Sequence, residues 1–148
     1  MSAGTIERTP RTVVGVDGSR ASQDALDWEA GMAEATGSAV MAIATWEWPR
    51  GLGQAVLTPA DDDPAGVVDG TAEHRPGVGG RVHPGVELVP VVVEGRAADV
   101  LVEASRGADL LAVGSRGHGE VAGLLVGSVS EHCATHAHSP VLVVRNRR

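Results

Sequence analysis

The sequence contains no lysine, so its twelve basic residues are all arginine. A Walker-type phosphate loop, a Schiff-base enzyme and a protein kinase each need a lysine at the reacting group. The absence of lysine excludes these three kinds of chemistry. The 19 acidic residues outnumber the arginines and give a net charge of −7. A field of this sign repels nucleic acid and anionic membrane surfaces, and we expect neither as a partner.

Aromatic residues and cysteine are also scarce. There is no Phe and no Tyr, and the three aromatic residues are all Trp. The core must therefore consist of Val, Leu, Ile and Ala, which suits thin strands covered by alanine-rich helices. The single cysteine, Cys133, excludes an internal disulfide and is typical of a reducing compartment. Because we find no charged-then-apolar leader and no apolar run of about 18 residues, we expect a cytoplasmic protein.

Short apolar runs alternate with amphipathic segments along most of the chain. The runs predict strands at residues 12–16, 40–46, 86–93, 109–113 and 140–144, and helices are predicted at 20–36, 96–107 and 128–136. In the first helix an apolar face is formed by Ala21, Ala25, Trp28, Met32 and Ala35, with Ser19 as N-cap and Gly37 at the end. Strand, helix and strand with short links predict a right-handed βαβ unit, and hence an α/β fold.

Residues 49–85 interrupt this alternation. They carry prolines at positions 49, 59, 64, 76 and 84 and many glycines. At about 1 kcal/mol for each Gly and about 3 kcal/mol for each Pro, no long helix can form, and at best a short helical piece spans 61–74. We expect a long connection where an α/β fold would place a crossover helix. Residues 1–10 predict a disordered tail, which leaves one domain over residues 11–148 and no second domain.

A glycine-rich stretch, GSRGHGEVAGLLVGSVS, follows the fourth predicted strand at residues 114–130. Gly114 and Gly117 are separated by two residues, and nine more precede Gly127-Ser128. Gly117 permits a turn with positive φ, and the last helix begins at Gly127, where unpaired N–H groups favour an anion. The hydroxyl groups at positions 128 and 130 can add donors. The stretch predicts a phosphate cradle, although an ordinary flexible loop with a serine cap has the same composition.

Asp17 follows the first predicted strand. In open parallel sheets, ligands bind beyond the carboxyl ends of the strands, where the strand order reverses. If the first strand lies beside the fourth, Asp17 and Gly114 are neighbours, and the carboxylate can accept hydrogen bonds from ribose hydroxyls. The alternative is a turn aspartate with an Asx-type hydrogen bond. Arg116 and His118, inside the glycine-rich stretch, either contact phosphate or are solvated.

The sequence offers little catalytic or metal-binding apparatus. His132, Cys133, His136 and His138 are metal-ligand types, but a second cysteine and an HExxH carboxylate are missing, and we expect no metal site. No Gly-x-Ser-x-Gly elbow or pair of carboxylates stands out, and no base is placed beside Cys133. The composition therefore favours a binding protein over an enzyme.

Four segments share a pattern with a known family: residues 13–19 (VVGVDGS), 94–101 (EGRAADVL), 108–119 (ADLLAVGSRGHG) and 127–145, which runs from GSVS to PVLVVR. Together they resemble the universal stress protein family. The resemblance implies a three-layer, Rossmann-like α/β fold with an open parallel five-stranded sheet of order 3-2-1-4-5. The segment 49–85 departs from it, because the family has a long second helix there. The complete G-x2-G-x9-G-S spacing marks the ATP-binding branch of that family.

The resemblance also implies a nucleotide site. Asp17 would hold the ribose or the adenine edge, and Val16 and Thr45 would line the base, with Thr45 standing where the family usually has Val. The ribose and phosphates would be held by Gly114, Arg116, Gly117, Gly127, Ser128 and Val129. Ser130 would be a further donor. The implied ligand is ATP, with or without Mg²⁺.

We consider three functions, of which the first two follow from this resemblance. The first is an ATP-binding stress-response protein that senses or buffers ATP, with at most slow hydrolysis or autophosphorylation. The second is a nucleotide-free dimer that acts through protein partners. The third is an enzyme that uses a related nucleotide fold, such as an adenylating ligase, and we disfavour it because a chain of this length leaves no room for a second substrate domain. Family members dimerise through the last strand, here Val141–Val144, which would otherwise be an exposed apolar edge.

Overall fold

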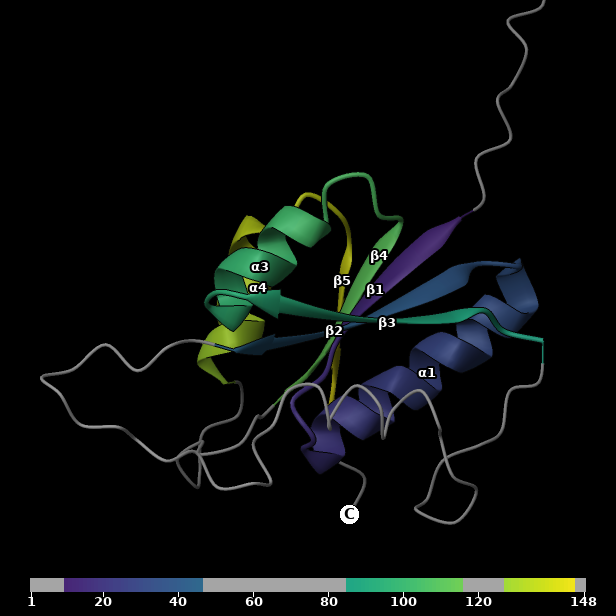
Figure 1. The fold of residues 1–148 in the computed structure, drawn as a ribbon, viewed down its shortest axis with the longest axis horizontal. Helices are drawn as coiled ribbons and strands as arrows, with labels where there is room; N and C mark the ends of the chain where they lie inside the picture. The colour runs from purple at the N-terminus through teal and green to yellow at the C-terminus, as the bar shows by residue number, and fades with distance from the viewer. Residues whose placement is uncertain (1–9, 47–84, 116–126, 146–148) are drawn as a thin grey trace, which may run out of the picture.

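The computed structural model describes residues 10–46, 85–115 and 127–145. They form five strands and three helices, shown in Figure 1: β1 (Arg11–Gly15), α1 (Arg20–Thr36), β2 (Ala39–Trp46), β3 (Leu88–Glu94), α3 (Ala97–Ala104), β4 (Leu110–Gly114), α4 (Ser128–His136) and β5 (Val141–Val144). Every strand and helix predicted outside residues 49–85 is present. The expected tail and the irregular connection lie outside the described residues, apart from Pro10 and Gly85.

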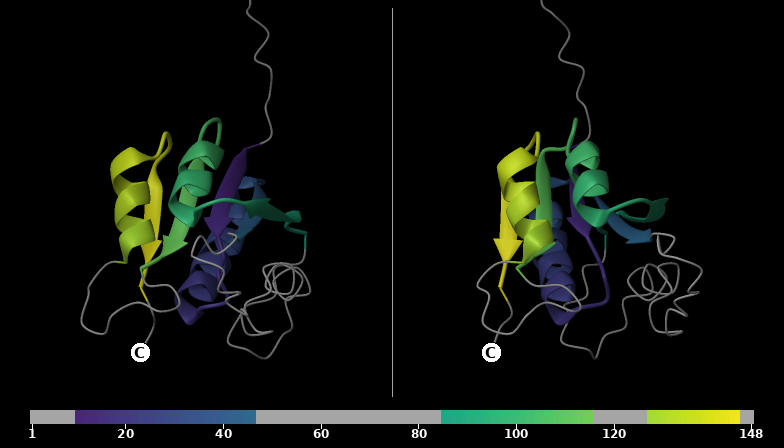
Figure 2. Two further views of the ribbon diagram at one scale, coloured as in Figure 1. Left: turned by 60° about the vertical axis from the view of Figure 1, so that its left-hand side comes forward. Right: turned by 90° about the vertical axis from the view of Figure 1, so that its left-hand side faces the viewer.

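The strands form one parallel sheet of order β3-β2-β1-β4-β5, which confirms the fold class predicted above. The central strand β1 pairs with both β2 and β4, so that Val14 lies between Ala42 and Ala112. One face of the sheet is covered by α1 and the other by α3 and α4, and this gives three layers (Figures 1 and 2). Among the described residues, no helix is both long and apolar enough to cross a bilayer.

Each face of the sheet has its own apolar core. Val14 of β1 packs with Ala25 and Leu26 of α1, whereas its neighbour Val13 packs with Leu101 of α3 and Cys133 of α4. Successive side chains of a strand point to opposite faces, and both faces are covered, so the strands are apolar without alternation. The core is built from Val, Leu, Ile and Ala, as the lack of Phe and Tyr requires.

The ends of α1 are those that the sequence predicts. Ser19 is the N-cap, and its hydroxyl oxygen accepts a hydrogen bond of 3.2 Å from the backbone N–H of Ser22. Gly37 ends the helix in the left-handed conformation at φ 72°, and its N–H donates to the carbonyl of Ala33 at 2.8 Å. A side chain at that φ would be strained, which explains the glycine.

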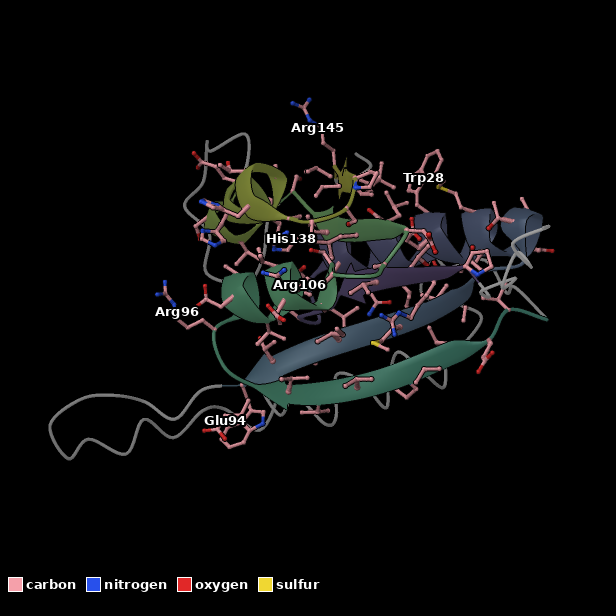
Figure 3. The ribbon with its side chains drawn as sticks, turned by 90° about the horizontal axis from the view of Figure 1, so that it is seen from above. Trp28, Glu94, Arg96, Arg106, His138 and Arg145 are labelled. Carbon is pink, nitrogen blue, oxygen red and sulfur yellow. The ribbon has the colours of Figure 1, made fainter. Side chains whose placement is uncertain are left out.

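The face of α1 that packs on the sheet is not the predicted one. Trp28 and Met32 are 49% and 41% exposed, and Ala35 is also exposed; Figure 3 shows Trp28 projecting at the edge of the molecule. The residues that are buried instead are Ala21, Ser22, Ala25, Leu26, Glu29 and Ala33. Only Ala21 and Ala25 belong to both sets, so the prediction was wrong for the larger residues.

The rotation of α1 about its axis follows from a contact with β4. A Cβ atom on Gly114 would lie 2.6 Å from the Cβ and the carbonyl carbon of Ala21, and 2.8 Å from the backbone N of Ser22. The first turn of the helix therefore rests directly on the glycine. The face that follows from this contact carries Ala25, Leu26, Glu29 and Ala33, and Trp28 and Met32 turn outward.

Candidate functional site

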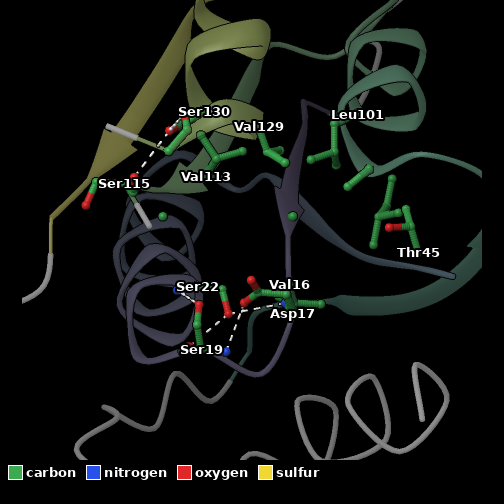
Figure 4. A pocket seen from close by; sticks show the side chains of 15 residues that line it. Val16, Asp17, Ser19, Ser22, Thr45, Leu101, Val113, Ser115, Val129 and Ser130 are labelled. Atoms are coloured by element: carbon green, nitrogen blue, oxygen red, sulfur yellow. Dashed lines mark hydrogen bonds between the residues drawn. The ribbon is translucent and has the colours of Figure 1, made fainter. Parts of the chain in front are cut away.

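A cavity of about 100 Å³ opens at the carboxyl edge of the sheet (Figure 4). It is lined by the ends of three strands and the starts of three helices. The strand ends contribute Gly15, Val16, Asp17, Ile43, Thr45, Val113, Gly114 and Ser115, and the helix starts contribute Ser19, Ser22, Ala97, Leu101, Gly127, Val129 and Ser130. In a right-handed parallel fold each helix starts at the edge where a strand ends, so these groups converge.

Most of the predicted site residues lie around this cavity. Those that line it are Val16, Asp17, Thr45, Gly114, Gly127, Val129 and Ser130. Ser128 is the exposed first residue of α4 and is not part of the lining. Arg116 and Gly117 lie outside the described residues. Because β1 pairs with β4, Asp17 and Gly114 line the same cavity, as expected.

The N-termini of two helices reach the cavity without a capping side chain. The N-cap of α4 is Gly127, which has none, and the N-cap of α3 is Arg96, whose side chain makes no capping hydrogen bond. The first backbone N–H groups of a helix have no partner within it, and they carry the positive end of the helix dipole. Such N–H groups can bind an anion at this edge of the sheet.

Asp17 forms the Asx-type turn that the sequence left as an alternative. Its Oδ1 accepts a hydrogen bond of 2.9 Å from the backbone N–H of Ser19, and its own N–H donates to the hydroxyl of Ser22 at 3.4 Å (Figure 4). A carboxylate has about four acceptor positions on its two oxygens. Asp17, which is exposed, can therefore hold this turn and still accept hydrogen bonds from ligand hydroxyls.

The two ends of the glycine-rich stretch are joined by hydrogen bonds. The Gly127 N–H donates to the Ser115 carbonyl at 2.6 Å. The buried Ser130 hydroxyl lies 2.9 Å from the Gly127 carbonyl and 3.3 Å from the Ser115 carbonyl (Figure 4). Ser130 thus holds the start of α4 beside the end of β4. Its expected role as a donor to a ligand stays a prediction.

Two hydroxyl groups that line the cavity make no hydrogen bond within the described part of the chain, those of Thr45 and Ser115. Thr45 was predicted. Ser115 was missed as a site residue although it lies inside the glycine-rich stretch. Leu101 was also missed, and its position follows from Gly15, on which a Cβ would lie 2.7 Å from the Leu101 Cδ1. The only signal for this contact in the sequence is a glycine in an otherwise apolar strand.

Of the residues considered as metal ligands, His132, Cys133, His136 and His138 do not line the cavity. His118 lies outside the described residues. The rings of His132 and His136 stack at 4.3 Å between centroids, and the Asp99 Oδ1 is 3.9 Å from the His132 Nε2. Within the described ranges, no three His, Cys, Asp or Glu residues are grouped as a metal ion would require. Burial raises the pKa of the Cys133 thiol to about 11, so the group is a neutral core residue at physiological pH.

Comparison with known sequences points to one family. The model of the universal stress protein family matches residues 9–145. A universal stress protein of Mycobacterium tuberculosis (strain H37Rv) is 39% identical over 139 residues, which cover 90% of this chain and 44% of the relative. One of Mycolicibacterium smegmatis is 33% identical over 148 residues, covering 91% of this chain and 45% of the relative. The chain thus spans about half the length of the curated relatives that it matches.

Solved structures agree with this match. UspA of Lactobacillus plantarum superposes with a TM-score of 0.74 at 21% identity, covering 93% of this chain and 99% of that one. A universal stress protein in complex with cAMP gives 0.67 at 26% identity, with 94% and 98% covered. A family protein of Arabidopsis thaliana with AMP bound gives 0.63 at 18% identity, with 93% and 92% covered. The chain belongs to the universal stress protein family.

Proposed function

We propose that the cavity binds an adenine nucleotide, with ATP as its ligand, and that the protein is a stress-response binding module. One observation carries the proposal: a carboxylate, Asp17, and an uncapped helix N-terminus, that of α4, line the same cavity. Unpaired N–H groups at a helix start bind phosphate, and a carboxylate accepts hydrogen bonds from ribose hydroxyls. A nucleotide carries both kinds of group.

The rest of the lining suits a base. Val16, Ile43 and Leu101 line the cavity with apolar side chains and are themselves 5%, 3% and 3% exposed. A planar heteroaromatic ring that displaces water from these apolar side chains gains a favourable free energy of binding. The Thr45 hydroxyl lines the same cavity, and we propose that it bonds to the edge of the base.

Adenine is proposed on two grounds. The family member in complex with cAMP, at 26% identity, contains an adenine nucleotide. The spacing of Gly114, Gly117 and Gly127-Ser128 is that of the ATP-binding branch. We therefore propose ATP, with or without Mg²⁺, and we propose that Arg116 and Gly117 contact its phosphates together with the start of α4.

The described lining supports binding over turnover. Asp17 is the only charged side chain among the described residues that line the cavity, and it holds the turn before α1. The one thiol of the chain, Cys133, is buried in the core between the sheet and the helices α3 and α4. We propose that hydrolysis or autophosphorylation, if measured, is slow, and that the protein acts by holding the nucleotide.

Calorimetric titration with ATP and Mg²⁺ tests the proposal. The wild-type protein should bind, and Gly127→Val should weaken binding by roughly tenfold or more, about 1.4 kcal/mol for each factor of ten, because the new side chain stands at the phosphate end of the cavity. Ala134→Val is the matched control, since it adds a valine at an exposed position of the same helix. It should bind as the wild type does.

Circular dichroism must first establish that each variant is folded. If folded wild-type protein releases no heat with ATP, the proposal fails and the nucleotide-free, partner-binding function takes its place. If Gly127→Val and Ala134→Val bind ATP equally well, the nucleotide is held elsewhere on the molecule.

A further inference from the structure

Helix α1 carries a carboxylic acid into the core between itself and the sheet. Glu29 is 0% exposed and lies on the buried line of the helix, one turn from Ala25 on one side and from Ala33 on the other. These two alanines are also buried, and Leu26 completes the apolar surroundings along the helix. An acid occupies a position at which the packing of the helix calls for an apolar residue.

The carboxyl group has no hydrogen-bond partner. Neither of its oxygens is within hydrogen-bond geometry of a donor in the described part of the chain. The Thr12 hydroxyl on β1 is directed toward the Ala39 carbonyl, at 3.4 Å, and does not satisfy the acid. Buried polar side chains are nearly always paired in native proteins, so an unpaired carboxyl group needs an explanation.

Among the described residues, no buried cation compensates the acid either. The strands that pack against α1 are β1, β2, β4 and β5, and their one charged side chain is Arg11, which is exposed at the start of β1. The other charged residues on α1 are Arg20, Asp24, Asp27 and Glu34, and none of these is buried. Burial raises the pKa of Glu29 above its ordinary value, and the nearby Thr12 hydroxyl, which does not meet hydrogen-bond geometry with the carboxyl group, lowers it only in part.

We propose that Glu29 makes the docking of α1 depend on pH: the acid is uncharged in the folded protein, and its ionisation at higher pH loosens the helix from the sheet. An isolated carboxylate in an apolar environment is far more costly than the neutral acid, because it loses its hydration without gaining a partner. The neutral acid can stay buried between α1 and the sheet. The charged form must move toward water, and α1 moves with it.

The direction of the effect follows from proton binding. In the unfolded chain Glu29 loses its proton at the ordinary pKa, whereas the folded chain keeps the proton to a higher pH. Stability is therefore greatest below the ordinary value and falls as the pH rises toward the folded-state value. Because the folded state binds at most one proton more than the unfolded state, the folding equilibrium constant falls by at most tenfold for each unit by which the pH rises.

Helix α1 also contributes Ser19 and Ser22 to the cavity and rests on Gly114. A ligand in the cavity would therefore bind more weakly as the pH rises. This extension rests on the proposed function, whereas the effect on stability does not, so the two can fail separately.

The test compares urea unfolding of the ligand-free wild type, Glu29→Gln and Glu34→Gln between pH 5 and 9. Glutamine is the uncharged isostere of glutamate, so the folding constant of Glu29→Gln should rise relative to the wild type with increasing pH, by up to tenfold per unit. Glu34 is exposed on the same helix, and its variant should follow the wild type. A ratio between Glu29→Gln and wild type that stays constant or falls with pH overturns the proposal.

The amide could itself prevent folding, since it brings two buried donors. A second measurement on the wild type then decides. The carboxyl carbon of Glu29, followed by nuclear magnetic resonance, should titrate at a higher pH than the exposed glutamates of the same protein. A midpoint among or below those of the exposed glutamates contradicts the proposal.

Discussion

At the scale of single residues, Gly114 has a role in addition to the one that its sequence context predicted. The glycine-rich stretch suggested that it lets the backbone approach a ligand. In the structure it lets the first turn of α1 approach β4, with a would-be Cβ only 2.6 Å from Ala21. Both roles concern the same edge of the sheet, because that turn carries Ser19 and Ser22 to the cavity. A one-dimensional pattern cannot distinguish them, since the contacting residue comes from a distant part of the chain.

Gly114→Ala should destabilise the protein by about 1–3 kcal/mol, the usual cost of adding a methyl group to a well-packed region. Gly15→Ala is the matched control, because its added methyl group meets the flexible side chain of Leu101 and not a backbone. We expect it to cost less. Urea unfolding at one pH measures both. Equal costs, or a larger cost at Gly15, would show that α1 does not rest tightly on β4.

At the scale of elements, the sequence predicted the helices and strands well and the orientation of α1 badly. The caps Ser19 and Gly37 are local signals, and each is used as predicted. The face of the helix is a tertiary property. Periodicity favoured the face with Trp28 and Met32, but the contact of the first turn with Gly114 placed the face with Ala25, Leu26 and Ala33 on the sheet. Glu29 was carried into the core by the same rotation, which no local pattern could reveal.

The edge strand β5 carries a second proposal at this scale. Among the described strands, β5 pairs with β4 alone, and Val141, Leu142 and Val143 are only half-buried. An apolar edge of this kind invites pairing with another chain. We propose a homodimer through Val141–Val144. Sedimentation equilibrium should give about twice the chain mass of 15.1 kDa, and a monomer at micromolar concentration would contradict the proposal.

At the scale of the whole molecule, the sheet order could be predicted from the family resemblance. The position of the cavity could be predicted because parallel α/β geometry brings the strand ends together. Asp17 and Gly114 line the same cavity for this reason. The contributions of Ser22 and Leu101 could not be predicted, because they depend on how each helix is rotated and seated on its face of the sheet. Arg116 and Gly117, both in the predicted site, lie outside the described residues and stay predictions.

The central claim is that an adenine nucleotide lies between Asp17 and the start of α4. A crystal structure of the protein grown with ATP and Mg²⁺ tests it most directly. The account predicts the ribose hydroxyls within hydrogen-bond distance of the Asp17 carboxylate, and phosphate oxygens on the N–H groups that follow Gly127. A nucleotide bound elsewhere, or an empty cavity at saturating ATP, would contradict the account.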